Sequence, residues 1–241
     1  MPTRLLFPIA LHLLLQPSTD VVPAVRRFEA RYHSASTLQA TFLERYSENG
    51  RLVRASAGIA YFRRPGKMRW EYESPEKNLF LVDGKSAWFY VPVDHTATRV
   101  PAKQSADWRT PLALLAGEAK LSRVCSAISP AKGELPESPE DVVVFCAVRG
   151  SQEKHEPTAQ PKGRSDASSS EDTIAFLELD TSSGELRRVL VRQPGGVSLE
   201  FKFANWQLNP SLPESFFHFA PSPGTAIVNG ELPPGKNPAN P

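Results

Sequence analysis

Strand-forming segments separated by short turns fill most of the chain and limit the folds it can adopt. VSLEFKFANW (197–206) and KMRWEYES (67–74) alternate apolar with polar residues, which is the pattern of a strand with one buried face. NLFLV and SAWFYV flank Asp83-Gly84, a strong hairpin signal. About ten such segments follow one another through short turns, and this succession predicts an antiparallel sheet. In the second half of the chain they are 121–128, 142–149, 174–180, 186–192 and 197–206.

Two segments have the spacing of helices rather than strands. Residues 20–33 place apolar side chains on one stripe, at Val22, Val25, Phe28 and Tyr32. RTPLALLAG (109–117) combines an N-cap threonine, a proline at the first helical position and a closing glycine. A sheet of about ten strands curls, and two short helices cannot cover it while it is flat. The sequence therefore predicts a mainly β chain, a curved and partly closed barrel with two or three short helices at its mouth.

Three stretches differ in composition from the strand-rich part of the chain. They lie at its start, at its end and at one internal position. Arg4 and the apolar run LLFPIALHLLL (5–15) are typical of a cleaved export signal at 1–19, although a buried N-terminal helix is the alternative. Residues 150–172 contain almost no apolar side chains, so we expect a disordered insertion there. We therefore predict one soluble domain at 20–228, interrupted by this insertion and followed by a disordered tail at 229–241.

The chain has two cysteines, Cys125 and Cys146, in β-like runs that could be neighbours in a sheet. In an oxidising compartment an even number of cysteines favours a disulfide, and two buried free thiols are the alternative. No histidine accompanies them at the spacing of a zinc site. We therefore expect a disulfide and no metal.

The sequence lacks the common catalytic motifs. Its five histidines are scattered, and no G-x-S-x-G, H-E-x-x-H, P-loop or G-x-G-x-x-G pattern occurs. Asp94 and His95 could belong to a triad, but a loop is the better interpretation because no serine context accompanies them. We expect no catalysis and no cofactor. An enzyme acting on lipid or envelope polymer would need a pocket with two or more buried acids, or a Ser–His pair.

The segment AYFRRPGKMRWEYESPEKN (60–78) places arginines beside aromatic residues, as a nucleic-acid groove or a latch on an apolar cavity would. Strand alternation puts Phe62 and Arg64 on one face and Tyr61 and Arg63 on the other. The aromatic residues therefore form mainly an apolar wall. The net charge of +2 is also a weak electrostatic footprint for a nucleic-acid partner, so we expect none.

The segment GIAYFRRPGKMRWEYESPEKNLFLVDGKSAWFYVP, followed by TPLALLAG, resembles the periplasmic outer-membrane lipoprotein carrier family, LolA. The shared pattern is a glycine-led strand, Arg-Pro, an R-W-x-Y strand, DGK with an aromatic strand, and Thr-Pro opening a leucine-rich helix. FHFAPSPGTAIV (217–228) is similar to the end of the family pattern. The resemblance covers roughly 20–228 and is strongest at 56–117, while the long insertion and the cysteine pair depart from it.

The resemblance implies an unclosed, antiparallel half-barrel with a helical lid over a hydrophobic cavity. It implies a periplasmic carrier that takes acylated lipoproteins from an inner-membrane lipoprotein-releasing ABC transporter to an outer-membrane receptor, and we expect a monomer. Arg64 matches the arginine that latches the lid, and Leu112 and Leu115 lie in the lid helix. The cavity wall would contain Phe42, Phe62, Met68, Trp70, Trp88 and Tyr90, for which ordinary core packing is the alternative. A soluble half-barrel sensor that binds lipid or lipoprotein without shuttling it is the alternative function.

Overall fold

The computed structural model describes residues 20–102, 110–117, 120–149 and 173–230. The predicted export signal at 1–19 and the predicted insertion at 150–172 lie outside the described residues. Of the predicted tail, the structure describes Asn229 and Gly230. Within the described ranges, no helix combines the length and the apolar character needed to cross a membrane.

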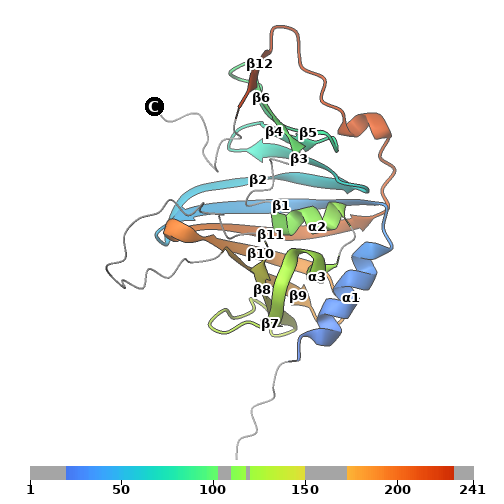
Figure 1. Ribbon diagram of the computed structural model, residues 1–241, viewed down its shortest axis with the longest axis vertical. Helices are drawn as coiled ribbons and strands as arrows, with labels where there is room; N and C mark the ends of the chain where they lie inside the picture. The colour runs from blue at the N-terminus through green and yellow to red at the C-terminus, as the bar shows by residue number, and fades with distance from the viewer. Residues whose placement is uncertain (1–19, 103–109, 118–119, 150–172, 231–241) are drawn as a thin grey trace, which may run out of the picture.

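The described strands form one 12-stranded sheet built from two meanders (Figure 1). One meander runs from β1 to β6 and the other from β7 to β11, and antiparallel pairing of β1 with β11 joins them. The outermost strands, β12 and β7, lie at opposite edges of the sheet, so the barrel is not closed. The strands are β1 (Thr37–Glu48), β2 (Arg51–Arg63), β3 (Lys67–Ser74), β4 (Leu79–Val82), β5 (Ser86–Val91), β6 (Thr96–Pro101), β7 (Cys125–Pro130), β8 (Asp141–Val148), β9 (Ile174–Asp180), β10 (Leu186–Gln193), β11 (Val197–Leu208) and β12 (Ala226–Asn229).

Three α-helices accompany this sheet in the described residues: α1 (Val22–His33), α2 (Thr110–Ala116) and α3 (Leu121–Val124). At the start of α1, the Asp20 carboxylate accepts a hydrogen bond from the backbone N–H of Val22 at 3.0 Å. The Tyr32 hydroxyl accepts one from the backbone N–H of Leu186 at 3.0 Å and so fixes α1 to the start of β10. We call the face of the sheet on which α2 packs the inner face and the opposite one the outer face. The predicted fold class, mainly β with short helices and an unclosed sheet, is confirmed.

β12 departs from the predicted antiparallel arrangement, because it pairs in parallel with β6. The chain after β11 first passes through the 3₁₀ turn η3 (Glu214–Phe217), and a parallel pair needs a long connection of this kind. The sheet is therefore mixed. Of residues 94–96, interpreted as a loop, Asp94 and His95 precede β6, and Thr96 is its first residue.

Residues 121–128 are not a continuous strand as predicted, because they begin with α3 and continue as β7. The backbone N–H of Leu121 donates to the Glu29 carboxylate of α1 at 2.9 Å, and the Leu121 side chain is fully buried. This contact with another helix stabilises the helical turn against the strand propensity of the segment. Cys125 on β7 and Cys146 on β8 form a disulfide with an S–S distance of 2.11 Å, which ties the edge strand to its neighbour.

Candidate functional site

An aromatic cluster on the inner face is the strongest candidate for a binding surface. Phe62 on β2 lies opposite Met68 on β3, and Trp70, further along β3, is only 2% exposed. The Trp70 ring contacts the rings of Phe42, Phe62, Phe201 and Phe203 at centroid distances of 4.8, 5.8, 5.4 and 6.1 Å. Phe42, Phe62, Met68 and Trp70 from the predicted wall are therefore together on one face.

Helix α2 covers this cluster. Leu112 and Leu115 are 0% and 1% exposed and belong to the same buried cluster as Trp70. The helix sequence TPLALLA has no charged residue, and a helix of seven residues is marginal on its own in water. α2 therefore depends on the inner face for its stability.

Arg64 directly follows β2 and connects the ends of two helices to the sheet. Its Nε donates a hydrogen bond to the carbonyl oxygen of Gly117, directly after α2. Its Nη1 donates to the carbonyl oxygens of His33 at 2.9 Å and Ala35 at 2.5 Å, at the end of α1. Helix C-termini favour a cation because of the helix dipole. Burial lowers the pKa of Arg64. The hydrogen bonds of Arg64 thus connect the ends of α1 and α2 to the end of β2.

Trp88 and Tyr90, which we expected in the cavity wall, lie on the outer face instead. Both contact the ring of Phe219 in the C-terminal segment, at centroid distances of 4.7 and 5.5 Å. Phe89, between them, points inward, because the pairing of β5 with β4 and of β4 with β3 places it in register with Trp70. The predicted wall is therefore wrong at Trp88 and Tyr90 and lacks Phe89.

A charged group on the inner face was not expected from the sequence. Glu44 is 1% exposed and lies in phase with Phe42 on β1. Its carboxylate pairs with Arg54 at 2.8 Å and accepts a hydrogen bond from the Tyr72 hydroxyl at 2.8 Å. The signal in the sequence is a glutamate at an apolar position of the alternating run TLQATFLERY. The aromatic inner face thus ends in a paired, buried polar group.

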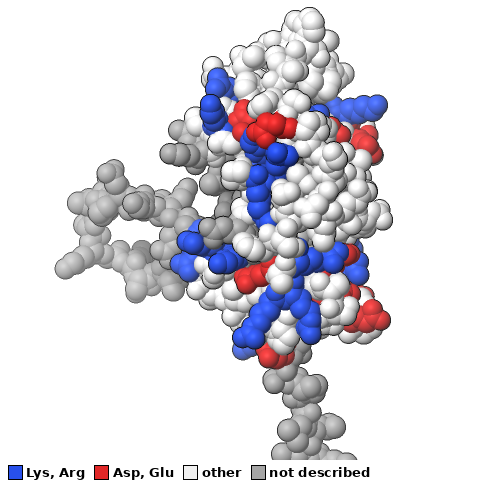
Figure 2. All heavy atoms as spheres, turned by 90° about the vertical axis from the view of Figure 1, so that its right-hand side faces the viewer, with Lys and Arg blue, Asp and Glu red and all other residues white. Residues whose placement is uncertain are grey.

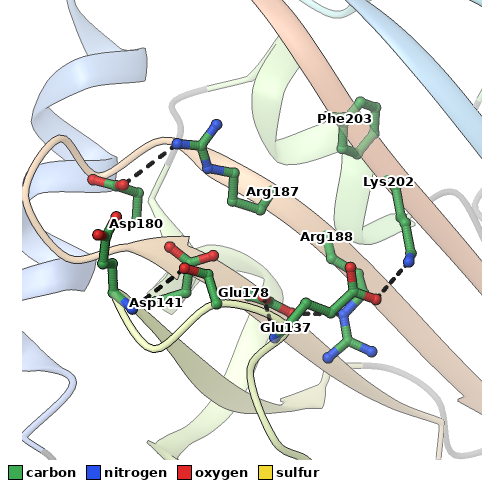
Figure 3. Close-up of a pocket in the computed structure, with 10 residues that line it drawn as sticks. Glu137, Asp141, Glu178, Asp180, Arg187, Arg188, Lys202 and Phe203 are labelled. Atoms are coloured by element: carbon green, nitrogen blue, oxygen red, sulfur yellow. Dashed lines mark hydrogen bonds and ion pairs between the residues drawn. The ribbon is translucent and has the colours of Figure 1, made fainter.

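The outer face carries a polar pocket of about 370 Å³ (Figure 3). Its walls include the buried acids Asp141, Glu178 and Asp180, which an enzyme acting on lipid or polymer would need. Glu178 pairs with the Arg188 guanidinium at 2.7 Å, and Asp180 accepts hydrogen bonds from the loop that follows it. Burial, with the nearby charge of Glu178, raises the pKa of Asp141 to about 6. Two of the three acids thus hold local structure: hydrogen bonds from Ser182 and Ser183 lower the pKa of Asp180, whereas the pKa of Asp141 is raised.

Charges of both signs lie next to each other on the side of the molecule that carries α1 and η3 (Figure 2). Arg31 pairs with Glu185 at 3.0 Å, and Arg63 and Lys67 both pair with Glu214. A groove for a nucleic-acid backbone instead collects positive charge along its length. Arg31, Arg63 and Lys67 are therefore engaged in local ion pairs.

Known proteins resemble this chain over most of its length. Residues 33–134 match the sequence profile of the family described as outer membrane lipoprotein carrier protein LolA. An outer-membrane lipoprotein carrier protein of Nitrosomonas europaea is 30% identical over 228 residues, covering 94% of this chain and 98% of the relative. Another outer-membrane lipoprotein carrier protein, from Nitrosospira multiformis, is 28% identical over 227 residues, covering 92% of this chain and 97% of the relative.

One solved structure shares the fold. The crystal structure of an uncharacterized conserved protein from Thermus thermophilus has a TM-score of 0.50 and 14% identity, covering 86% of this chain and 97% of the other. At that identity the match concerns the fold alone, whereas the match to the Nitrosomonas europaea protein concerns the sequence of nearly the whole chain. The chain belongs to the outer-membrane lipoprotein carrier family, LolA.

Proposed function

We propose that this protein is a soluble periplasmic carrier that binds the acyl chains of lipoproteins between α2 and the inner face. It takes them from an inner-membrane lipoprotein-releasing ABC transporter and delivers them to an outer-membrane receptor. The observation that carries the proposal is the hydrogen bonding of Arg64 to the end of α2, an apolar helix that packs over an aromatic wall. The names of the relatives support the same class of cargo.

The inner face has the chemistry that acyl chains require. Each buried CH₂ group contributes about 0.8 kcal/mol, so a chain that replaces α2 against Phe62, Met68 and Trp70 is held firmly without polar contacts. Release of the acyl chain needs a free-energy contribution that opposes binding and equals that of a few buried CH₂ groups. A hydrogen bond from a charged donor, at about 1.5–3 kcal/mol, is of that size. In this mechanism an exported monomer exchanges lid contacts for cargo contacts, with no catalytic step and no cofactor.

Mass spectrometry of the protein purified from its own periplasm tests the proposal. We expect acylated lipoprotein to co-purify with the wild type and to be lost from Met68→Glu, which puts a charge on the inner face. Leu43→Glu is the matched control, because Leu43 lies on the outer side of β1 and is 40% exposed. Thermal unfolding checks that both variants fold. A wild-type protein without acylated cargo, or equal loading of Met68→Glu, would contradict the proposal.

A transfer assay separates the carrier from a sensor. The protein is loaded with purified lipoprotein and then mixed with membranes that hold the outer-membrane receptor. A carrier passes the lipoprotein to these membranes, whereas a sensor binds it and retains it. Binding without transfer would therefore support a soluble half-barrel sensor and contradict the shuttling part of the proposal.

A further inference from the structure

The indole N–H of Trp70 is a buried hydrogen-bond donor with no acceptor among the residues that the structure describes. Its Nε1 has no hydrogen-bond partner within the part of the chain that the structure describes, although the residue is only 2% exposed. Buried polar groups in native proteins are nearly always paired, and an unpaired one calls for an explanation. Trp206 in the same cluster follows the rule, because its Nε1 donates to the carbonyl oxygen of Leu186 at 2.8 Å.

Packing alone does not require a nitrogen at this position. The rings around Trp70 are phenylalanines, and they contact it edge to face, as an aromatic hydrocarbon would. Phenylalanine would keep most of these contacts without burying an unpaired donor. The indole N–H therefore adds a polar atom to the wall, and no described residue accepts a hydrogen bond from it.

Trp70 lies beside the point where the inner face changes from apolar to polar. Tyr72 follows Trp70 on the same face of β3 and donates its hydroxyl hydrogen to Glu44. The rings of Trp70 and Tyr72 both contact the ring of Phe42, at 4.8 and 5.2 Å. The polar atoms of an acyl chain are at its head. If the chain lay on the aromatic wall, its head would lie at this boundary.

We propose that the Trp70 indole N–H donates a hydrogen bond to the ester carbonyl oxygen at the head of a bound acyl chain. The inference rests on the proposed acyl-binding function and adds an ester-recognising group to it. An indole N–H is a donor only, so its partner must be an acceptor. An ester carbonyl is an uncharged acceptor attached to the chain itself, so it enters an apolar cluster without the penalty of burying a charge. The ester belongs either to an acylated lipoprotein or to a diacyl phospholipid.

A pair of matched lipids tests this hydrogen bond. The probes are a diacyl phosphatidylglycerol and its dialkyl ether analogue of equal chain length, which lacks the carbonyl oxygens. Wild-type protein should bind the ester probe roughly tenfold more tightly than the ether probe, the value for one hydrogen bond that also satisfies a buried donor. Trp70→Phe should bind both probes alike, with an affinity near that of wild type for the ether. Equal binding of the ester and ether forms by wild type, with these lipids and with an acylated-cysteine peptide alike, or a preference that Trp70→Phe retains, would overturn the inference.

Nuclear magnetic resonance observes the same bond directly. The indole N–H signal of Trp70 is identified as the one that is missing from Trp70→Phe. It should move downfield when the ester probe is added and stay in place with the ether probe. The signal of Trp206 is the internal control, because its donor is already paired. No movement of the Trp70 signal, as expected if the N–H points at a phenylalanine ring, would refute the proposal.

Two further arms separate the possible failures and sources. If wild type binds neither probe, nor a synthetic acylated-cysteine peptide, the acyl-binding function itself is wrong and the inference falls with it. If the ether lipid binds but no ester preference appears, only the role of the Trp70 N–H is wrong. An ester preference seen with the peptide and its ether form, but not with the phospholipids, would assign the carbonyl to lipoprotein cargo.

Discussion

Replacing Arg64 by leucine should weaken closure of the lid without removing the lid. The change deletes three hydrogen bonds, of which the one to the Gly117 carbonyl reaches the end of α2 and two reach the end of α1. The backbone bond from Gly66 to the Ala116 carbonyl, at 2.8 Å, is unaffected. The buried contacts of Leu112 also remain. We therefore expect a shift in the balance of open and closed states.

The size of the shift follows from the bond to Gly117. A hydrogen bond from a charged donor contributes about 1.5–3 kcal/mol, and ~2 kcal/mol is suitable for the partly buried Arg64. Losing ~2 kcal/mol raises the ratio of open to closed protein by about thirtyfold. Cargo that is already bound should be held at least as firmly, because its apolar contacts are unchanged. Onward transfer should fail, because closure no longer helps to expel the acyl chains.

The assay pairs lipoprotein loading with transfer to membranes that carry the receptor. Arg45→Leu is the matched control, because Arg45 lies on the outer face with its side chain 44% exposed and pairs with Glu200 at 3.4 Å. Strand alternation alone would favour Arg63→Leu as the control. The structure excludes that choice, because Arg63 donates to the Leu212 carbonyl at 2.9 Å and pairs with Glu214, so its loss would loosen the C-terminal segment.

Normal transfer by Arg64→Leu would refute the latch, and so would an equal defect in Arg45→Leu. If Arg64→Leu neither loaded nor transferred lipoprotein, the latch would also be contradicted, because Arg64 would then stabilise the binding-competent state rather than the closed one. The expected pattern, retained loading with failed transfer in Arg64→Leu alone, is specific to a bond made only when the lid is closed.

Three further measurements test other parts of the fold. Replacing Cys125 and Cys146 by alanine should lower the free energy of unfolding by about 3 kcal/mol, the chain-entropy value for a loop of this size, and an unchanged urea midpoint would contradict this. Deleting 150–172 should leave acyl binding and Tm unchanged, because its composition buries little apolar area, and a large fall in Tm would show that it packs. The raised pKa of Asp141 means that the folded protein holds this proton more tightly than the unfolded chain does. The free energy of unfolding should therefore fall as pH rises from about 4 to about 6, and Asp141→Asn should remove on the order of 2 kcal/mol of this change; a flat wild-type profile would contradict the shift.

Alternation along a strand predicts which face a side chain occupies only where apolar and polar residues take turns. Phe62, Met68 and Trp70 lie on the inner face as expected, because charged or polar neighbours mark the other face. SAWFYV offers three consecutive aromatic residues, so the pattern cannot choose between faces. The choice depends on pairing with β4, which the Asp83 carboxylate helps to set by accepting hydrogen bonds from Lys85 and Ser86 at 2.7 Å.

Pairs of charged residues on neighbouring strands were beyond the sequence pattern. Glu44 is in phase with Phe42, which indicates an acid on a buried face, but nothing nearby identifies Arg54 and Tyr72 as its partners. A buried carboxylate is tolerated only when such partners are present. The same limit applies to the outer pocket, where the pairing of β9 with β10 brings Glu178 to Arg188.

In the proposed mechanism the lid and the cargo compete for one surface, and this competition would explain why a single arginine matters. Burying Leu112 and Leu115 stabilises the closed empty protein by about 1.5–3 kcal/mol each. An acyl chain gains the same kind of contact with the same wall, so apolar burial alone does not decide between lid and cargo. The bond from Arg64 to the Gly117 carbonyl is different, because a hydrocarbon chain has no acceptor to replace that carbonyl oxygen. It therefore favours the empty closed state specifically, and transfer needs such a bias, since an acyl chain otherwise gains nothing by leaving one apolar surface for another.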